Sequence, residues 1–166
     1  MLSNCRRAIL ASGTQRGESQ PKPNGGGSSR PPFLGCDVTR KVLIVDDDQS
    51  IRFVLREVLR ADGWAVDEVE DGAAVEDQLE RQRYDLLMLD LYMPGMNGFE
   101  VLRRIRQSHA AVLPIWKTPP TVGIIVLSGA AGSEGLNFAA RLGADICLRK
   151  PLELSDVIAA VRGISR

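Results

Sequence analysis

Short apolar runs alternate along this chain with segments whose apolar residues recur at helical spacing. Three runs are apolar at every position, as strands covered on both faces of a sheet require, and an alternating segment at 64–69 is typical of a strand near a sheet edge. The predicted strands are 42–45, 64–69, 86–89, 124–127 and 146–148. The predicted helices are 51–59, 73–82, 98–106, 136–142 and a last one that carries the apolar residues of 154–161.

This order of elements predicts an α/β fold with a doubly wound sheet. Strands that alternate with helices form a parallel sheet covered on both faces, because each right-handed crossover lays its helix against the sheet. Ligands of such folds bind beyond the carboxyl ends of the strands. Any chemistry of this chain is therefore expected at that edge.

Polar side chains follow four of the predicted strands at the point where each strand ends. They are Asp46, Asp47 and Asp48 after the first strand, Asp90 at the third, Ser128 at the fourth and Lys150 just past the fifth. Carboxylates drawn together repel one another unless a cation lies among them. Hard oxygen ligands with room for water suit Mg²⁺, and no cysteine or histidine in these positions favours zinc.

Each of these residues, taken alone, also has a purely structural interpretation. The acidic triplet can cap the following helix, and Asp48 is expected to do so. Asp90 can be a turn aspartate, Ser128 a turn serine and Lys150 a solvated charge. Their joint position at the ends of separate parallel strands favours a functional site.

Four segments, VLIVDDDQSIR, LLMLDLYMPGMNGFEVLRRIR, IIVLSG and CLRKP, resemble the successive motifs of the receiver domains of two-component response regulators. The resemblance covers residues 41–165 and implies a stand-alone receiver similar to chemotaxis response regulators. It also implies a flavodoxin-like, five-stranded parallel sheet with strand order 2-1-3-4-5. We accordingly expect a receiver domain at 40–166 behind a disordered basic tail at 1–39.

The resemblance implies a role for each residue of the site. Asp90 would accept a phosphoryl group from the phosphohistidine of a sensor histidine kinase or phosphotransfer protein. Asp46 and Asp47 match the Mg²⁺-binding pair, with Asp47 as the direct ligand and Asp46 acting largely through water. Asp90 itself and the backbone carbonyl of Tyr92 would complete the protein ligands.

The remaining matches concern the switch. Ser128 matches the switch hydroxyl, and Lys150 matches the lysine that pairs with the phosphoryl group. Cys147 stands where similar receivers carry an aromatic residue, so coupling through such a ring is expected to be absent. We interpret Cys147 as a small packed residue rather than a redox group. The chain would not be an enzyme acting on other molecules: it would catalyse only its own phosphorylation and dephosphorylation, and so switch the binding of a partner.

Three rival functions were weighed against this interpretation. An aspartyl-phosphate phosphatase typically has a second acid two residues after the first, where this chain has Tyr92. A nucleotide-binding loop is disfavoured because residues 129–135 match neither the GxxxxGK[ST] pattern nor the dinucleotide fingerprint. A pseudo-receiver, folded alike but never phosphorylated and acting as a protein-interaction module, is disfavoured by the complete set of acceptor, metal ligands and lysine.

Charge and composition narrow the partners further. Residues 1–40 carry six basic and two acidic residues, whereas the rest carries 15 basic and 19 acidic ones. A mildly acidic domain without a basic stripe is a poor nucleic-acid binder. No apolar run approaches the roughly 18 residues of a membrane span. The three cysteines lack metal or redox spacing, which favours a reducing compartment and a cytoplasmic location.

One connection is longer than the fold requires. Residues 107–123 join a predicted helix to a strand, although such connections usually take about 2–6 residues. This segment is expected at the amino ends of the strands, opposite the site. It can be a partner contact or a tolerated insertion, and we favour the latter. Its residue His109 is given no role in phosphotransfer.

Overall fold

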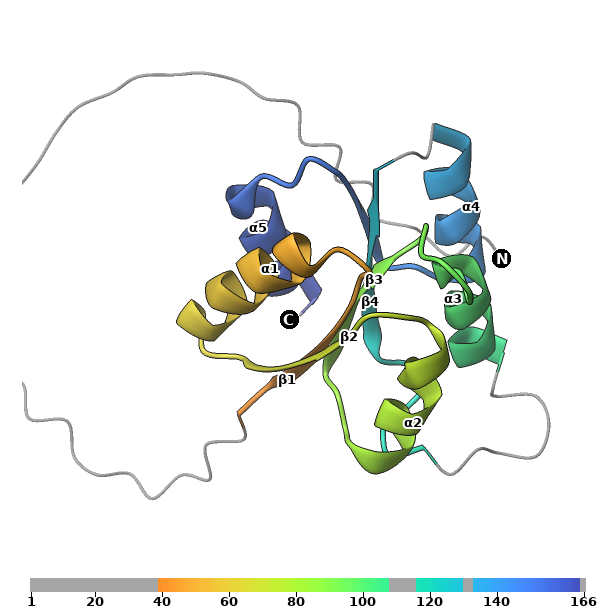
Figure 1. Cartoon of the computed structure of the whole chain (residues 1–166), viewed down its shortest axis with the longest axis horizontal. Helices are drawn as coiled ribbons and strands as arrows, with labels where there is room; N and C mark the ends of the chain where they lie inside the picture. Colours follow the sequence, from red (N-terminus) through yellow and green to blue (C-terminus); the bar gives the residue numbers. More distant parts are fainter. Residues whose placement is uncertain (1–38, 108–115, 130–132, 165–166) are drawn as a thin grey trace, which may run out of the picture.

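The computed structural model describes residues 39–107, 116–129 and 133–164 (Figure 1). The predicted tail at 1–39 lies outside these residues except for Thr39, and so does His109. Ten elements follow one another as β1 (Lys41–Val45), α1 (Gln49–Ala61), β2 (Ala65–Val69), α2 (Ala73–Arg81), β3 (Leu86–Asp90), α3 (Gly98–Gln107), β4 (Gly123–Ser128), α4 (Ser133–Leu142), β5 (Ile146–Arg149) and α5 (Leu154–Ile164).

The five strands form one parallel sheet in the order β2-β1-β3-β4-β5, which confirms the predicted fold class and strand order. In Figure 1, α1 and α5 lie on one face of the sheet, and α2, α3 and α4 lie on the other. Within the described residues, no helix is long and apolar enough to cross a membrane.

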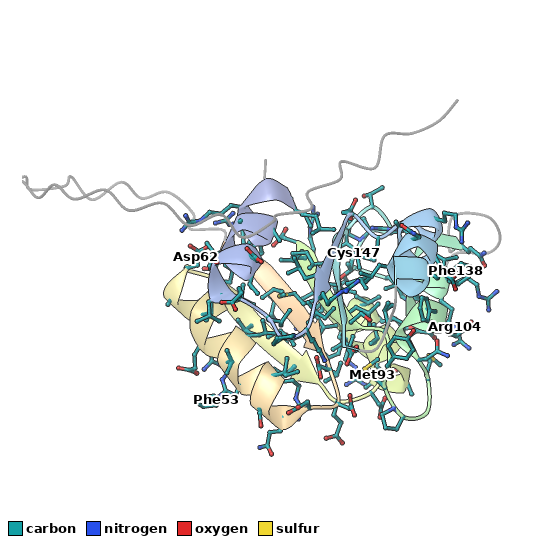
Figure 2. All side chains as sticks on the ribbon, turned by 90° about the horizontal axis from the view of Figure 1, so that it is seen from above. Phe53, Asp62, Met93, Arg104, Phe138 and Cys147 are labelled. Atoms are coloured by element: carbon teal, nitrogen blue, oxygen red, sulfur yellow. The ribbon has the colours of Figure 1, made fainter. Side chains whose placement is uncertain are left out.

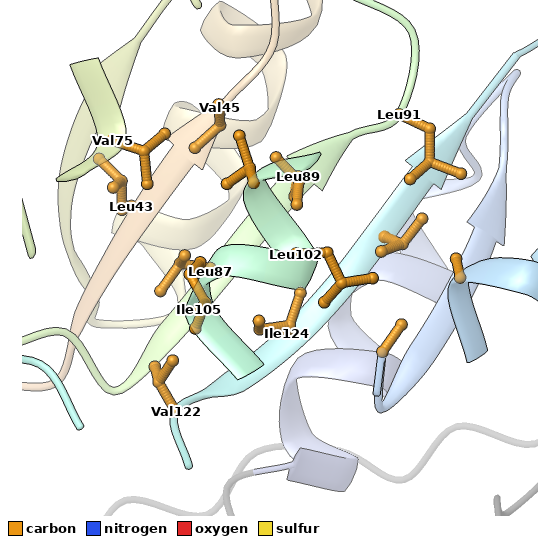
Figure 3. Close-up of a cluster of buried hydrophobic side chains, with 14 of the residues drawn as sticks. Leu43, Val45, Val75, Leu87, Leu89, Leu91, Leu102, Ile105, Val122 and Ile124 are labelled. Carbon is orange, nitrogen blue, oxygen red and sulfur yellow. The ribbon is translucent and has the colours of Figure 1, made fainter. Parts of the chain in front are cut away.

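Alternate side chains of the inner strands enter two separate hydrophobic clusters. On β1, Leu43 and Val45 pack with α2 and α3, whereas Val42 and Ile44 pack with α1 and α5. The same alternation on β3 and β4 places Leu87 and Ile124 in the first cluster (Figure 3). Because both faces of these strands are covered, their central positions, 42–45, 86–89 and 124–127, are all apolar.

The edge strands show a different pattern of burial, because each has a neighbouring strand on only one side. All five residues of β2 are half-buried, and β5 is half-buried until its exposed last residue, Arg149. The alternating pattern expected at 64–69 therefore belongs to an edge strand, although Trp64 itself lies just before β2. Its indole ring is buried beneath the guanidinium of Arg40, 4.6 Å from the ring centroid.

The described end of the long connection packs onto the domain. Trp116 is half-buried against the cluster below α2 and α3. Thr118 is buried, and its hydroxyl accepts from the Tyr84 amide at 3.0 Å and donates to the Gln82 carbonyl at 2.7 Å. Residues 116–123 are thus an integral part of the fold at the amino ends of the strands, opposite the polar edge, as expected.

Candidate functional site

The structure brings the predicted acidic residues together at the carboxyl edge of the sheet. Asp46 follows β1 directly, Asp90 ends β3, and both are buried, whereas Asp47 is exposed. One carboxylate oxygen from each of the three lies within 4.8 Å of the others. Ser128 is fully buried at the end of β4, and its carbonyl accepts from the Lys150 amide at 2.9 Å. The three acids inferred from strand ends therefore lie together at one edge, and the backbone of Ser128 is bonded to that of Lys150.

Lys150 holds the two buried carboxylates together. Its Nζ donates to Asp46 Oδ2 and to Asp90 Oδ2, each at 2.7 Å. Burial alone would lower the pKa of Lys150, but the bonds to the two carboxylates outweigh burial and raise this pKa. Burial raises the pKa of Asp46, and the bond from Lys150 offsets this only in part. The ammonium therefore stays charged between the two acids.

Backbone amides bind the second oxygen of each buried carboxylate. The Asp48 amide donates to Asp46 Oδ1 at 3.0 Å, and the Tyr92 amide donates to Asp90 Oδ1 at 3.1 Å. Asp48 itself caps α1, since its Oδ1 accepts from the amides of Ser50 and Ile51 at 2.8 and 3.4 Å. These bonds lower the pKa of Asp48 and confirm its predicted capping role.

Asp47 is the one acid of the cluster whose carboxylate has no hydrogen bond or ion pair with the described part of the chain. Three ionised carboxylates and one ammonium leave a formal charge of two minus, which a divalent cation would neutralise. All of the clustered donor atoms are oxygens, with neither sulfur nor imidazole among them. The donor set thus fits Mg²⁺, as the sequence predicted.

The loop that follows Asp90 needs a glycine where it meets α3. The Gly98 amide donates to the Leu91 carbonyl at 3.1 Å, and a Cβ at position 98 would overlap the carbonyl oxygen of Asp90. Only a residue without a side chain lets the loop return this closely to β3. Gly98 therefore sets the path of the backbone directly behind Asp90.

Sequence reasoning gave no role to Arg52, which lies against the same site. Its Nη1 donates to the backbone carbonyls of Asp46 and Asp47 at 2.6 and 3.1 Å. From the sequence, a basic residue on an amphipathic helix is expected to be a solvated charge, and bonds to backbone carbonyls leave no pattern of residue types. The one feature that could have indicated contact with the site is that Arg52 lies one helical turn after the cap residue Asp48.

Position 147 carries a cysteine instead of an aromatic ring, but aromatic side chains contact one another close by. Cys147 is half-buried on β5, and its Sγ lies 3.7 Å from the Leu136 carbonyl of α4. Phe99 meets Tyr92 edge-on at 5.9 Å between ring centroids and meets Phe138 of α4 at 5.5 Å. Figure 2 labels Phe138 and Cys147 on these neighbouring elements. A chain of rings thus runs from the loop after Asp90 to α4.

A family model described as the response regulator receiver domain matches residues 42–162. The transcriptional regulatory protein CpxR of Escherichia coli strain K12 is 35% identical over 127 residues, which are 76% of this chain and 49% of that protein. The sensor protein EvgS of the same strain is 36% identical over 117 residues, 70% of this chain and 9% of that protein. The chain spans about half of CpxR and a small part of EvgS.

Solved structures of similar architecture include the chemotaxis protein CheY4 of Vibrio cholerae. It is 26% identical, with a TM-score of 0.66, and the match covers 76% of this chain and 99% of that one. A putative response regulator from Chloroflexus aurantiacus is 29% identical with a TM-score of 0.67, and the match covers 77% and 99% of the two chains.

Proposed function

Because this chain belongs to the response-regulator receiver family, we propose that it is a phosphorylatable switch with Asp90 as the phosphoryl acceptor. Receiver domains are the signalling modules of two-component phosphorelays. The observation that carries the assignment is the bond from Lys150 Nζ to Asp90 Oδ2, made at the carboxyl edge of the sheet beside two further acids.

The chemistry assigned to Asp90 is nucleophilic. A carboxylate oxygen forms a bond to phosphorus while the bond from phosphorus to the donor's imidazole nitrogen breaks, and the electron pair leaves with that nitrogen. The product is an acyl phosphate on Asp90. Catalysis of such transfers rests on positioning and on neutralisation of charge. The Tyr92 amide orients the carboxylate, and Lys150 supplies a positive charge beside the incoming phosphoryl oxygens.

We assign Asp46, Asp47, Asp90 and the backbone carbonyl of Tyr92 to a Mg²⁺ site. The bound cation would supply further charge neutralisation for the phosphoryl group. Before phosphorylation, Lys150 keeps the buried carboxylates of Asp46 and Asp90 from repelling each other. This prearranged pairing supports a site that accepts negative charge.

Ser128 is the proposed switch. Its side chain lies at the end of β4, shortly before α4 begins at Ser133. A hydrogen bond from its hydroxyl to the phosphoryl group would exist only after phosphorylation, and such a differential contact shifts a two-state equilibrium. Because the chain continues from Ser128 toward α4, this helix is the first element to respond.

The proposed donor is a sensor histidine kinase or a phosphotransfer protein. Its phosphohistidine must reach a nearly buried carboxylate, so its surface must touch the rim of the site. Exposed apolar side chains suit such a contact. Phe53, labelled on α1 in Figure 2, is 54% exposed, and Val54 on α1 and Leu154 at the start of α5 are 44 and 48% exposed. The similarity of one segment of the sensor protein EvgS to this chain is compatible with a phosphorelay.

Phosphorylation by a small acyl-phosphate donor in the presence of Mg²⁺ tests this function. One phosphoryl group per chain should be incorporated, and both EDTA and the substitution Asp47→Ala should prevent this without unfolding the domain. Incorporation of the phosphoryl group that is unaffected by EDTA and by Asp47→Ala would contradict the metal assignment. A folded chain that accepts nothing from acyl phosphates or from a panel of histidine kinases would instead be a pseudo-receiver.

A further inference from the structure

Arg52 binds three consecutive carbonyl groups of the acidic loop between β1 and α1. Its guanidinium Nη1 donates to the carbonyls of Asp46 and Asp47, and its backbone amide donates to the Asp48 carbonyl at 3.0 Å. The last of these is the ordinary first hydrogen bond of a helix, which a residue of any type would make. The bonds from the guanidinium, in contrast, depend on which side chain stands at position 52.

The two carbonyls bound by the guanidinium belong to neither the strand nor the helix. Asp46 lies just beyond β1 and Asp47 lies before the cap of α1, so regular hydrogen bonding of these elements does not reach them. Because Asp46 is fully buried, water is a poor substitute as a donor. The guanidinium therefore sets the path of this loop.

A second anchor holds the guanidinium from the side of the sheet. Arg52 Nε lies 3.6 Å from Glu68 Oε2 on β2, and the side chain of Arg52 is only 13% exposed. Glu68 also accepts from Arg56 Nη1 at 2.9 Å. A planar group held at both ends has little freedom, so the acidic loop is tied to the edge of the sheet.

The orientation of the Asp47 carboxylate depends most on the bonds that Arg52 makes to this loop. Both oxygens of Asp46 and of Asp90 have partners, whereas the exposed carboxylate of Asp47 has none among the described residues. Its direction therefore depends on its own backbone. We propose that Arg52 is a positioning residue for the divalent cation: it fixes the Asp47 backbone so that the carboxylate faces the site. This rests on the metal site of the proposed function.

The charge of Arg52 acts in the opposite direction, since a guanidinium near the site repels a cation. Loss of an outer partner that orients a metal ligand typically weakens metal binding by about 10–100-fold. The repulsion between Arg52 and the cation is expected to be smaller than this effect, because the guanidinium charge is already paired with the carbonyls and with Glu68. If positioning dominates, two substitutions should each weaken Mg²⁺ binding by roughly tenfold. Arg52→Lys keeps the charge but lacks the planar group that binds the carbonyls through Nη1 and faces Glu68 through Nε, and Arg52→Met removes the charge as well.

The test is a Mg²⁺ titration of the full chain, followed by the amide NMR signals of Asp47, Asp90 and Tyr92. The dissociation constant is read only from folded protein, so a change in stability alone does not alter it. Arg56→Met is the matched control: Arg56 bonds to the same Glu68 but to no carbonyl of the loop, and wild-type affinity is expected. If Arg52→Met does not fold, Arg52→Lys still decides the question.

Two results would overturn the inference. One is an unchanged Mg²⁺ affinity in Arg52→Lys, and the other is tighter binding in Arg52→Met, which would mean that repulsion dominates. Both are distinct from a failure of the proposed function. That failure would appear in the wild-type chain, as no Mg²⁺ binding or as binding that survives Asp47→Asn.

Discussion

The backbone of Gly98 lies directly against the carbonyl group of Asp90. A Cβ at position 98 would overlap that oxygen and would lie 2.9 Å from Leu91 Cα, and both neighbours are backbone atoms that cannot rotate away. The first turn of α3 is therefore packed onto the residue proposed to accept the phosphoryl group.

We expect Gly98→Ala to destabilise the domain by about 1–3 kcal/mol, the usual cost of overpacking, and to slow phosphorylation by displacing Asp90. Gly163→Ala is the control. Gly163 lies in α5, and a Cβ at this position would meet the Ile146 side chain only at 3.8 Å, an ordinary contact. Alanine should therefore stabilise the domain by up to about 1 kcal/mol. Urea unfolding measures both effects, and equal stability of the two variants would contradict the packing argument.

Lys150→Met should leave the buried carboxylates of Asp46 and Asp90 without their shared cation. Breaking a buried pair in this way costs about 3 kcal/mol or more, so the variant should unfold at lower urea in EDTA. Mg²⁺ should restore part of the stability because it binds the folded state.

Lys41→Met is the matched control for this experiment. Lys41 pairs with Asp67 at 2.9 Å, but the two side chains are 26 and 36% exposed. Its loss should cost less than about 1 kcal/mol, with no dependence on Mg²⁺. The absence of any Mg²⁺ effect on Lys150→Met would contradict a cation site between the carboxylates.

Glu100 on α3 should titrate far below an ordinary glutamate. Hydrogen bonds from Arg103 and Arg104 lower its pKa from 4.5 to about 2. Because the folded pKa is the lower one, the interaction stabilises the fold above pH 4.5 and this contribution is lost as the pH falls toward 2. Side-chain NMR should give a midpoint near 2. Arg103→Gln combined with Arg104→Gln should raise it toward 4.5, and a wild-type midpoint already near 4.5 would show that these bonds do not form.

Phosphorylation should change α4 more than β5. Cys147 is too small to fill and vacate a pocket as a ring does. The chain of rings that begins at Tyr92 ends at Phe138, on α4. We expect amide hydrogen exchange to change modestly, mainly in residues 129–142 and only weakly around Cys147. Large changes across β5 and α5 would show that the signal takes another route.

The fold was predictable because its inner strands are buried on both faces. β1, β3 and β4 therefore each contain an uninterrupted run of four apolar residues, at 42–45, 86–89 and 124–127. Helix α1 was predicted at 51–59 but spans Gln49–Ala61, because apolar spacing marks only the buried side of a helix and not its ends. Asp46 and Asp90 were predicted to meet at the site because strand ends are easy to place in a parallel sheet.

Other parts of the site depend on the backbone and were not predictable in this way. The bonds of Arg52 end on carbonyl groups, which are the same in every residue type. The need for glycine at position 98 arises from the return path of the loop onto Asp90, and side-chain patterns do not encode that path. Outside the site, at the amino ends of the strands, Thr118 likewise became part of the core through bonds to the backbone at Gln82 and Tyr84.

The identity of the acceptor is the central claim, and the mass of the intact chain tests it directly. Treated with an acyl phosphate and Mg²⁺, the wild-type chain should gain the mass of one phosphoryl group, stable to acid and labile to base. Asp90→Asn should gain none while it remains folded by circular dichroism. Phosphorylation of Asp90→Asn to the wild-type level would contradict the account.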